Sequence, residues 1–158
     1  MSAPARHQLG LLLLCDDPIP LVARLLADGF LRAGDIPGTW RPGPVDLVGG
    51  GFLQARVVPF DSEQFISSGQ GGFRVWCPDG GPNITAAFAR ALTNWRAGGA
   101  RSMACGCGAV HDLPDLDYRP SCGFSRGWVE LVDVGSSDLT AAGHAALPLH
   151  TPILARRG

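Results

Sequence analysis

The stretch LGLLLLCDDPIPLVARLLADG at residues 9–29 joins an unbroken apolar run to a segment with helical periodicity. The run Leu9–Leu14 has the length of a strand, and its lack of alternation is typical of a strand buried on both faces. The apolar residues that follow recur on one face of a helix: Leu21, Val22, Leu25 and Leu26. We expect this helix to end at Gly29 or Gly34, since glycine commonly follows the last helical residue.

Four further strands are predicted from alternating apolar residues and from the turn residues that bound them. They lie at residues 52–60, 63–67, 73–76 and 124–134. The segment between the first helix and these strands, residues 34–51, is rich in glycine and proline and is expected to be irregular.

Two further helices are predicted, each beginning with a polar residue that can cap its first turn. The first runs from Asn83 to Ala97, and the second runs from Thr140 to Leu147. The order β-α-β-β-α-β, with an appended strand and a short C-terminal helix, predicts a ferredoxin-like α+β sandwich. We expect residues 1–158 to form a single α+β domain, because the length suits one domain and no linker interrupts the chain.

The composition excludes several classes of function. All 13 cationic residues are arginines, and they nearly balance 14 acidic residues, for a net charge of −1. This balance is not that of a strongly basic nucleic-acid-binding protein. Because the chain has no lysine, a P-loop lysine and a Schiff-base lysine are both excluded.

The apolar N-terminal run is interpreted as a buried strand rather than a lipoprotein signal. Leu14 stands directly before Cys15, where a lipoprotein signal has a small residue. No segment approaches the roughly 18 apolar residues that span a bilayer. We therefore expect a cytoplasmic protein whose five cysteines are thiols or metal ligands rather than a disulfide framework.

Three of the cysteines occur in two glycine-rich turns. These are CPDGG at residues 77–81 and CGCG at residues 105–108. Residues 77–111 resemble a zinc ribbon, in which Cys-Pro-x-Cys-Gly knuckles aim backbone amides at thiolate sulfurs. The resemblance departs from the family pattern at Gly80, which stands in the place of a second cysteine. Cys77 and Cys105 are also separated by 27 residues, more than the usual spacing of about 15–20.

A Cys₃His ligand set can be assembled from this segment. Its members are Cys77, Cys105, Cys107 and His111, and Cys122 can replace His111 if the chain folds back after Pro120. Such a set is typical of a structural Zn²⁺ site, which leaves no position open for chemistry. The alternative is that no metal binds and that Cys77 and Cys122 are small buried hydrophobic residues.

The same residues allow two catalytic hypotheses. Cys105 and Cys107 can form a redox dithiol, although thiol oxidoreductases normally place two residues between their cysteines at a helix N-terminus. His111 and Asp112 supply the residue types of a Cys-His-Asp hydrolase, but adjacent residues rarely converge on one point. The redox enzyme is the alternative function that we carry forward.

The favoured function is a small cytoplasmic α+β domain of bacterial type that acts as a binding or interaction module for a protein partner. Neither a nucleic acid nor a membrane is expected as a partner. A homodimer through a sheet edge or an apolar helix face is a further expectation, because open sheet edges have to be covered or blunted.

Overall fold

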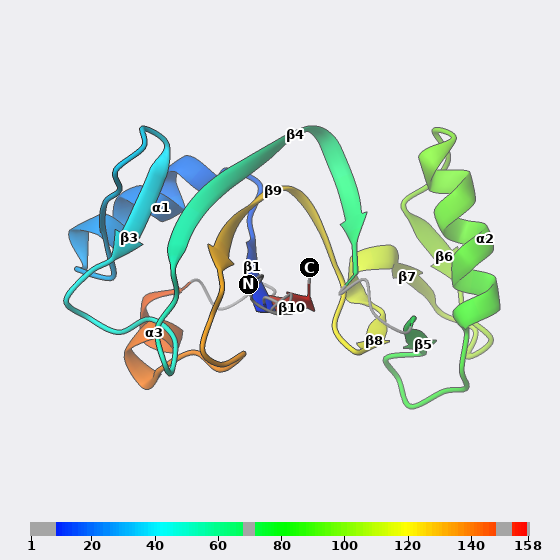
Figure 1. Ribbon diagram of the computed structural model, residues 1–158. Coiled ribbons are helices and arrows are strands. Elements are labelled where there is room, and N and C mark those ends of the chain that lie inside the picture. Colours follow the sequence, from blue (N-terminus) through cyan, green and yellow to red (C-terminus); the bar gives the residue numbers. More distant parts are fainter. Residues whose placement is uncertain (1–8, 68–71, 148–152, 158) are drawn as a thin grey trace, which may run out of the picture. The chain divides into compact units, whose positions relative to one another are not determined.

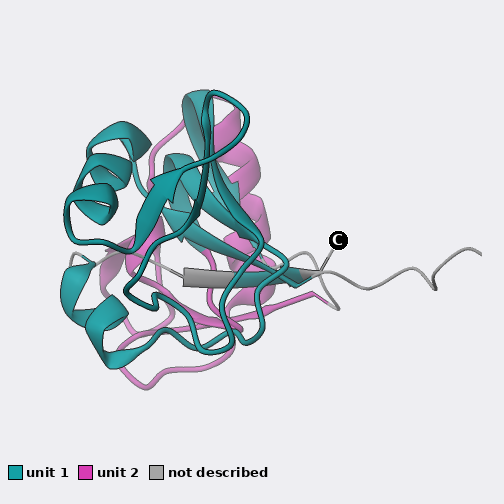
Figure 2. Cartoon of the chain, turned by 60° about the vertical axis from the view of Figure 1, so that its left-hand side comes forward, with its two compact units in different colours: residues 1–70, 123–158 teal, residues 71–122 magenta. Residues whose placement is uncertain are grey.

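The computed structural model, shown in Figure 1, describes residues 9–67, 72–147 and 153–157. The chain divides into two compact units, which are coloured separately in Figure 2. Unit 1 comprises residues 1–70 and 123–158, and unit 2 comprises residues 71–122. Unit 2 is therefore an insertion in the sequence of unit 1. The single domain expected over the whole chain stays a prediction.

Unit 1 is built on a six-stranded sheet in which every neighbouring pair is antiparallel. In spatial order its strands are β10 (Ile153–Arg157), β1 (Leu9–Leu14), β9 (Gly123–Val132), β4 (Gln54–Ile66), β3 (Thr39–Pro42) and β2 (Leu31–Ala33). β1 and β9 confirm two predicted strands. β2, β3 and β10 were not predicted, because runs of three to five residues carry too little periodicity.

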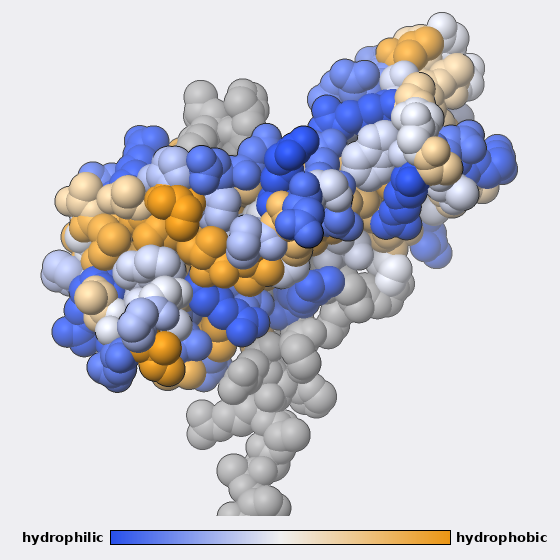
Figure 3. All heavy atoms as spheres, turned by 90° about the horizontal axis from the view of Figure 1, so that it is seen from above, coloured by the Kyte–Doolittle hydropathy of each residue, from blue (hydrophilic) through white to orange (hydrophobic). Residues whose placement is uncertain are grey.

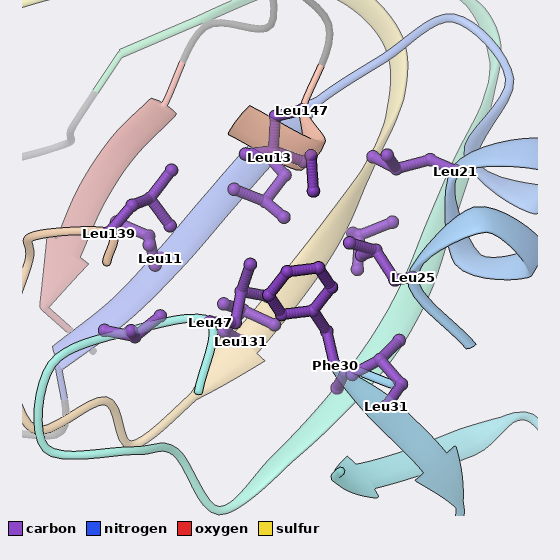
Figure 4. Close-up of a cluster of buried hydrophobic side chains, with 14 of the residues drawn as sticks. Leu11, Leu13, Leu21, Leu25, Phe30, Leu31, Leu47, Leu131, Leu139 and Leu147 are labelled. Atoms are coloured by element: carbon purple, nitrogen blue, oxygen red, sulfur yellow. The ribbon is translucent and has the colours of Figure 1, made fainter. Parts of the chain in front are cut away.

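One face of the sheet carries the main hydrophobic core of unit 1 (Figure 4). Leu11 and Leu13 of β1 and Leu131 of β9 are each 0% exposed in this cluster. The face is covered by α1 (Pro18–Ala27), which confirms the first predicted helix, and by α3 (Ala141–Ala146). Burying one such leucine contributes about 1.5–3 kcal/mol, so this layer is the principal source of stability for unit 1.

The second face of the sheet carries a smaller cluster. Leu12 and Leu14 of β1 pack there with Ile66 and with the half-buried Phe60 and Trp128. The rings of Phe60 and Trp128 meet edge to face, with their centroids 4.9 Å apart. Burial on both faces is why the apolar run of β1 shows no alternation.

Two helix ends in unit 1 follow the predicted signals. α1 is followed by Gly29, whose φ of 83° lies in the left-handed region that favours glycine. Thr140 caps α3, because its Oγ1 accepts a hydrogen bond from the backbone N–H of Gly143 at 3.0 Å. The proline that follows this helix in the sequence, Pro148, lies outside the described residues.

β4 is a single strand where two strands were predicted. It pairs with β9, with a shift of register between Pro59 and Gln64, and the two strands curve together in Figure 1. The separate strands predicted at residues 52–60 and 63–67 are therefore wrong. Pro59 does not end the strand, because it borders the irregularity, where proline is tolerated.

Unit 2 consists of two short two-stranded sheets, a helix and a 3-10 turn. Its elements are β5 (Arg74–Trp76) paired with β8 (Asp117–Arg119), β6 (Ser102–Ala104) paired with β7 (Val110–Asp112), α2 (Thr85–Arg96), and the turn Leu113–Asp115. β5 and α2 confirm the predicted strand and helix in this part of the chain. β6, β7 and β8 were not predicted, because runs of three residues carry too little periodicity.

The core of unit 2 is an aromatic cluster beneath α2. Phe88 is 1% exposed, and its ring meets Tyr118 of β8 and Phe73 edge to face at centroid distances of 5.4 Å and 5.9 Å. The start of α2 is held by Asn83, whose Oδ1 accepts the backbone N–H of Thr85 at 2.9 Å. The helix begins at Thr85, so Ile84 rather than the predicted Asn83 stands at the N-cap, and it has no side-chain cap.

The predicted ferredoxin-like sandwich is wrong, whereas the mixture of helices and strands agrees with an α+β protein. That topology needs the strand at residues 73–76 to join the main sheet. In the structure β5 pairs with β8 in a separate sheet of unit 2, and the main sheet has the order β10-β1-β9-β4-β3-β2. α2 likewise belongs to unit 2, where it packs on β5 and β6.

Both units expose hydrophobic side chains. Ile19, Ile36 and Leu53 in unit 1 and Val110 in unit 2 are each more than half exposed. On the face drawn in Figure 3, hydrophobic residues gather on part of unit 1 among hydrophilic ones. Within the described ranges, the helices are all too short or too polar to cross a bilayer.

Candidate metal centre

Four side chains of unit 2 converge on one point. The ligand atoms of Cys77, Cys105, Cys107 and His111 all lie within 4.8 Å of one another. Cys77 follows β5, and the other three belong to the hairpin that β6 and β7 form. The structure thus brings together the four residues that the sequence predicted as ligands.

The first knuckle is the turn that begins at Cys77. The backbone N–H of Gly80 donates to the carbonyl oxygen of Cys77 at 3.3 Å, and the φ of Gly80 is 78°. The backbone N–H groups of Asp79 and Gly81 point at the sulfur of Cys77. Amides aimed at a thiolate in this way are typical of a zinc knuckle.

The second knuckle repeats this arrangement in the loop between β6 and β7. The backbone N–H of Gly108 donates to the carbonyl oxygen of Cys105 at 3.0 Å, and the φ of Gly108 is 90°. The backbone N–H of Cys107 points at the sulfur of Cys105. The two turns therefore share the same glycine position and the same amide-to-sulfur contact.

His111 completes the cluster from β7. Its Nε2 lies 3.7 Å from the Sγ of Cys107, and its side chain is 15% exposed. Zn–S bonds of about 2.3 Å and Zn–N bonds of about 2.0–2.1 Å place such ligands about 3.6 Å apart around a tetrahedral ion. The observed separation matches this edge, and three thiols with one imidazole are donor types that Zn²⁺ takes in structural sites.

Hydrogen bonds help to shift the pKa values of the two buried thiols, Cys77 and Cys105, in opposite directions. The Cys105 thiol and the backbone N–H of Asp79 donate to the sulfur of Cys77, and these bonds lower the pKa of Cys77 to about 7. The backbone N–H of Cys107 favours the Cys105 thiolate, but the bond to Cys77 and burial together raise the pKa of Cys105 above its ordinary value. Negative charge therefore develops first on Cys77, and the thiolate is the form that binds a metal.

A fifth polar side chain, Asp79, lies at the edge of the cluster. Its Oδ2 is 3.4 Å from Nε2 of His111 and 4.0 Å from Sγ of Cys107. We did not predict this residue as part of the site. A signal was present in the sequence, because Asp79 stands two residues after Cys77, as Cys107 stands two residues after Cys105.

The other predicted candidates lie outside this cluster. The thiol of Cys122 is directed at the carbonyl oxygen of Pro120 at 3.6 Å, and Cys122 is not among the four clustered residues. His111, and not Cys122, is therefore the fourth residue of the cluster. The exposed Asp112 follows His111 on β7, and its side chain takes no part in the cluster.

Comparison of the chain with protein-family models, with curated proteins and with solved structures found no significant match. The function is therefore inferred from the chemistry of the cluster.

Proposed function

We propose that the protein binds one Zn²⁺ ion through Cys77, Cys105, Cys107 and His111. The observation that carries this proposal is the convergence of the four ligand atoms within 4.8 Å. Three thiolates and one imidazole are the ligands that structural zinc sites use. The paired knuckle turns add the backbone amides that stabilise thiolate ligands.

A structural role follows from the size and composition of unit 2. Units as small as residues 71–122 bury a limited hydrophobic core and are often stabilised by a metal. The core of unit 2 centres on Phe88, and its strands are only three residues long. Zinc binding would contribute directly to the folding of such a unit, because the site forms only when the two knuckles meet.

We further propose that the protein is a cytoplasmic interaction module and that the zinc-stabilised unit 2 presents a surface to a protein partner. A cytoplasmic location suits the site, because reducing conditions there keep the thiol ligands available to the metal. Unit 1 offers the sheet edges β2 and β10 as candidate surfaces for a homodimer, since edge strands can pair with a further strand.

The geometry gives less support to a catalytic thiol. Sγ of Cys107 and Oδ2 of Asp79 both approach the same ring nitrogen, Nε2 of His111. A nucleophile-activating triad needs the carboxylate on the other nitrogen of the imidazole. A redox dithiol at Cys105 and Cys107 lacks the helix N-terminus that activates such pairs, because the two residues lie in a hairpin loop.

The zinc proposal is tested by the metal content of the purified protein. We expect about one zinc per chain, its removal by a chelator, and a loss of dispersed amide resonances from unit 2 after removal. Cys105→Ser should abolish zinc binding, whereas the matched Cys122→Ser in the same unit should retain it. A wild-type protein that takes up no zinc would overturn the proposal. Rapid, reversible disulfide formation between Cys105 and Cys107 in the metal-free protein would favour the redox alternative.

A further inference from the structure

Asp79 lies at ligand-like distances from two of the four clustered residues, His111 and Cys107. Around a tetrahedral zinc ion, a carboxylate oxygen lies about 3.4 Å from a nitrogen ligand and about 3.6 Å from a sulfur ligand. Oδ2 of Asp79 lies 3.4 Å from Nε2 of His111 and 4.0 Å from Sγ of Cys107. The distance from the carboxylate to His111 is therefore the one expected between two ligands of one zinc ion, and the distance to Cys107 is slightly longer than expected.

The backbone explains why Asp79 and Cys107 reach the same place. In each knuckle, the residue two positions after the first cysteine donates its backbone N–H to that cysteine's sulfur. A glycine with positive φ comes directly after this donor residue. Asp79 holds this position in the first knuckle, and Cys107 holds it in the second. The two side chains therefore start from equivalent points of two similar turns that face one metal position.

Exposure divides the donors into a buried set and an outer set. Cys77 and Cys105 are 2% and 6% exposed, and the His111 side chain is 15% exposed. The Asp79 side chain is 62% exposed, and Cys107 is exposed as well. Two of the five donors thus meet water, and they lie beside each other.

We propose that Asp79 is an alternate ligand that replaces Cys107 on the metal, an inference that rests on the proposed zinc site. The Zn–S bond to Cys107 would break, a Zn–O bond to the Asp79 carboxylate would form, and Cys107 would leave as a thiolate that keeps the electron pair of the broken bond. One anionic ligand replaces another, so the charge of the complex is unchanged. The metal would then stay bound by Cys77, Cys105, His111 and Asp79, while the released Cys107 thiolate is free to react with a soft electrophile.

The experiment is a double-mutant cycle on metal affinity, measured by Co²⁺ titration and by competition with Zn²⁺. We expect Asp79→Ala to bind nearly as tightly as the wild type, because Cys107 still occupies the position. Cys107→Ala should retain about one metal per chain, weakened by no more than about a hundredfold, with a weaker sulfur-to-cobalt charge-transfer band. The double variant should lose binding to the extent that Cys105→Ala does.

The outcomes separate this inference from the zinc proposal. If the wild type binds no metal, both fail. If the wild type binds but Cys107→Ala binds no better than Cys105→Ala, only the alternate ligand fails. It also fails if the Asp79→Ala substitution lowers metal affinity by the same factor in the wild-type background and in the Cys107→Ala background.

A second measurement avoids variants whose folding is impaired by the loss of a cysteine. Iodoacetamide is added to the zinc-loaded wild type and to zinc-loaded Asp79→Ala, and zinc release is followed with a chromophoric indicator. We expect the wild type to keep zinc after Cys107 is alkylated, and Asp79→Ala to release zinc as the alkylation proceeds. Equal release from both proteins would overturn the inference.

Discussion

Nε2 of His111 lies 3.7 Å from Sγ of Cys107, a contact that the β6–β7 hairpin makes by pairing His111 with Met103. Because this pairing fixes the imidazole beside the knuckle, His111→Ala should weaken metal affinity by at least about a hundredfold. Co²⁺ titration of the purified variant measures the change. His144→Ala, an exposed histidine of α3, is the matched control and should bind as the wild type does. An unchanged affinity in His111→Ala would remove the imidazole from the ligand set.

Gly81 is held against the first knuckle. A Cβ at Gly81 would lie 2.7 Å from the Cβ of Cys77 and 3.0 Å from its sulfur, whereas a Cβ at Gly106 would meet nothing within 4 Å. We therefore expect Gly81→Ala to displace Cys77 and lower metal affinity by about tenfold or more. Gly106→Ala should leave affinity unchanged. Competition with a chromophoric chelator measures the metal affinity of the two variants. Equal affinities would show that the first knuckle can accommodate a Cβ at Gly81 without weakening metal binding.

Cys15 and Cys122 should resist alkylation at neutral pH. Burial raises the pKa of each thiol to about 11, and the thiolate is the reactive form. In metal-free protein at pH 8, we expect iodoacetamide to label the exposed Cys107 first, and the rates at Cys15 and Cys122 to rise steadily up to about pH 11. Peptide mass spectrometry assigns the order of labelling. Early labelling of Cys15 would contradict its burial.

The same two thiols predict a loss of stability at high pH. Their pKa rises from an ordinary value of 9.0 to about 11 on folding, so the folded state favours the protonated form. The corresponding contribution to stability is complete below pH 9 and is lost as the pH rises to about 11. Urea denaturation at several pH values measures this decline. The decline should be smaller in a Cys15→Ala variant, and an identical decline would refute the assignment to Cys15.

Leu131 lies at the centre of the main sheet and is 0% exposed. Leu131→Ala should lower the free energy of unfolding by about 2–5 kcal/mol, because it leaves a cavity between the sheet and its covering helices. Leu53 is 59% exposed, and Leu53→Ala should change the free energy by no more than about 0.5 kcal/mol. Urea denaturation compares the two. A small effect at Leu131 would mean that the core of unit 1 lies elsewhere.

The parts of the fold that were predictable are those in which a long hydrophobic pattern decides the structure. Leu9–Leu14 and the segment from Asn83 to Ala97 have such patterns, and β1 and α2 agree with them. Strand partners were not predictable, because pairing depends on contacts between distant residues. Arg74 pairs with Arg119, for example, and no local pattern in either strand indicates the other.

The candidate site was predictable from cysteine and histidine because few other residue types suit a zinc ion. Asp79 was missed because an aspartate in a glycine-rich turn is usually a solvated residue. Its importance depends on the likeness of the two turns in three dimensions. That likeness is visible in the backbone hydrogen bonds and in the positive φ angles of Gly80 and Gly108.

β4 and β9 remain paired as far as Ile66 and Gly123, close to both ends of the inserted unit 2. The insertion therefore leaves and re-enters the sheet at neighbouring positions, as the loop of an ordinary hairpin does. Closing even a long unfolded loop at such a point costs only about 3–4 kcal/mol, because the entropy of closure grows with the logarithm of length. The segment that carries the candidate metal centre could therefore be inserted or removed between two paired strands without a change in the strand order of the main sheet.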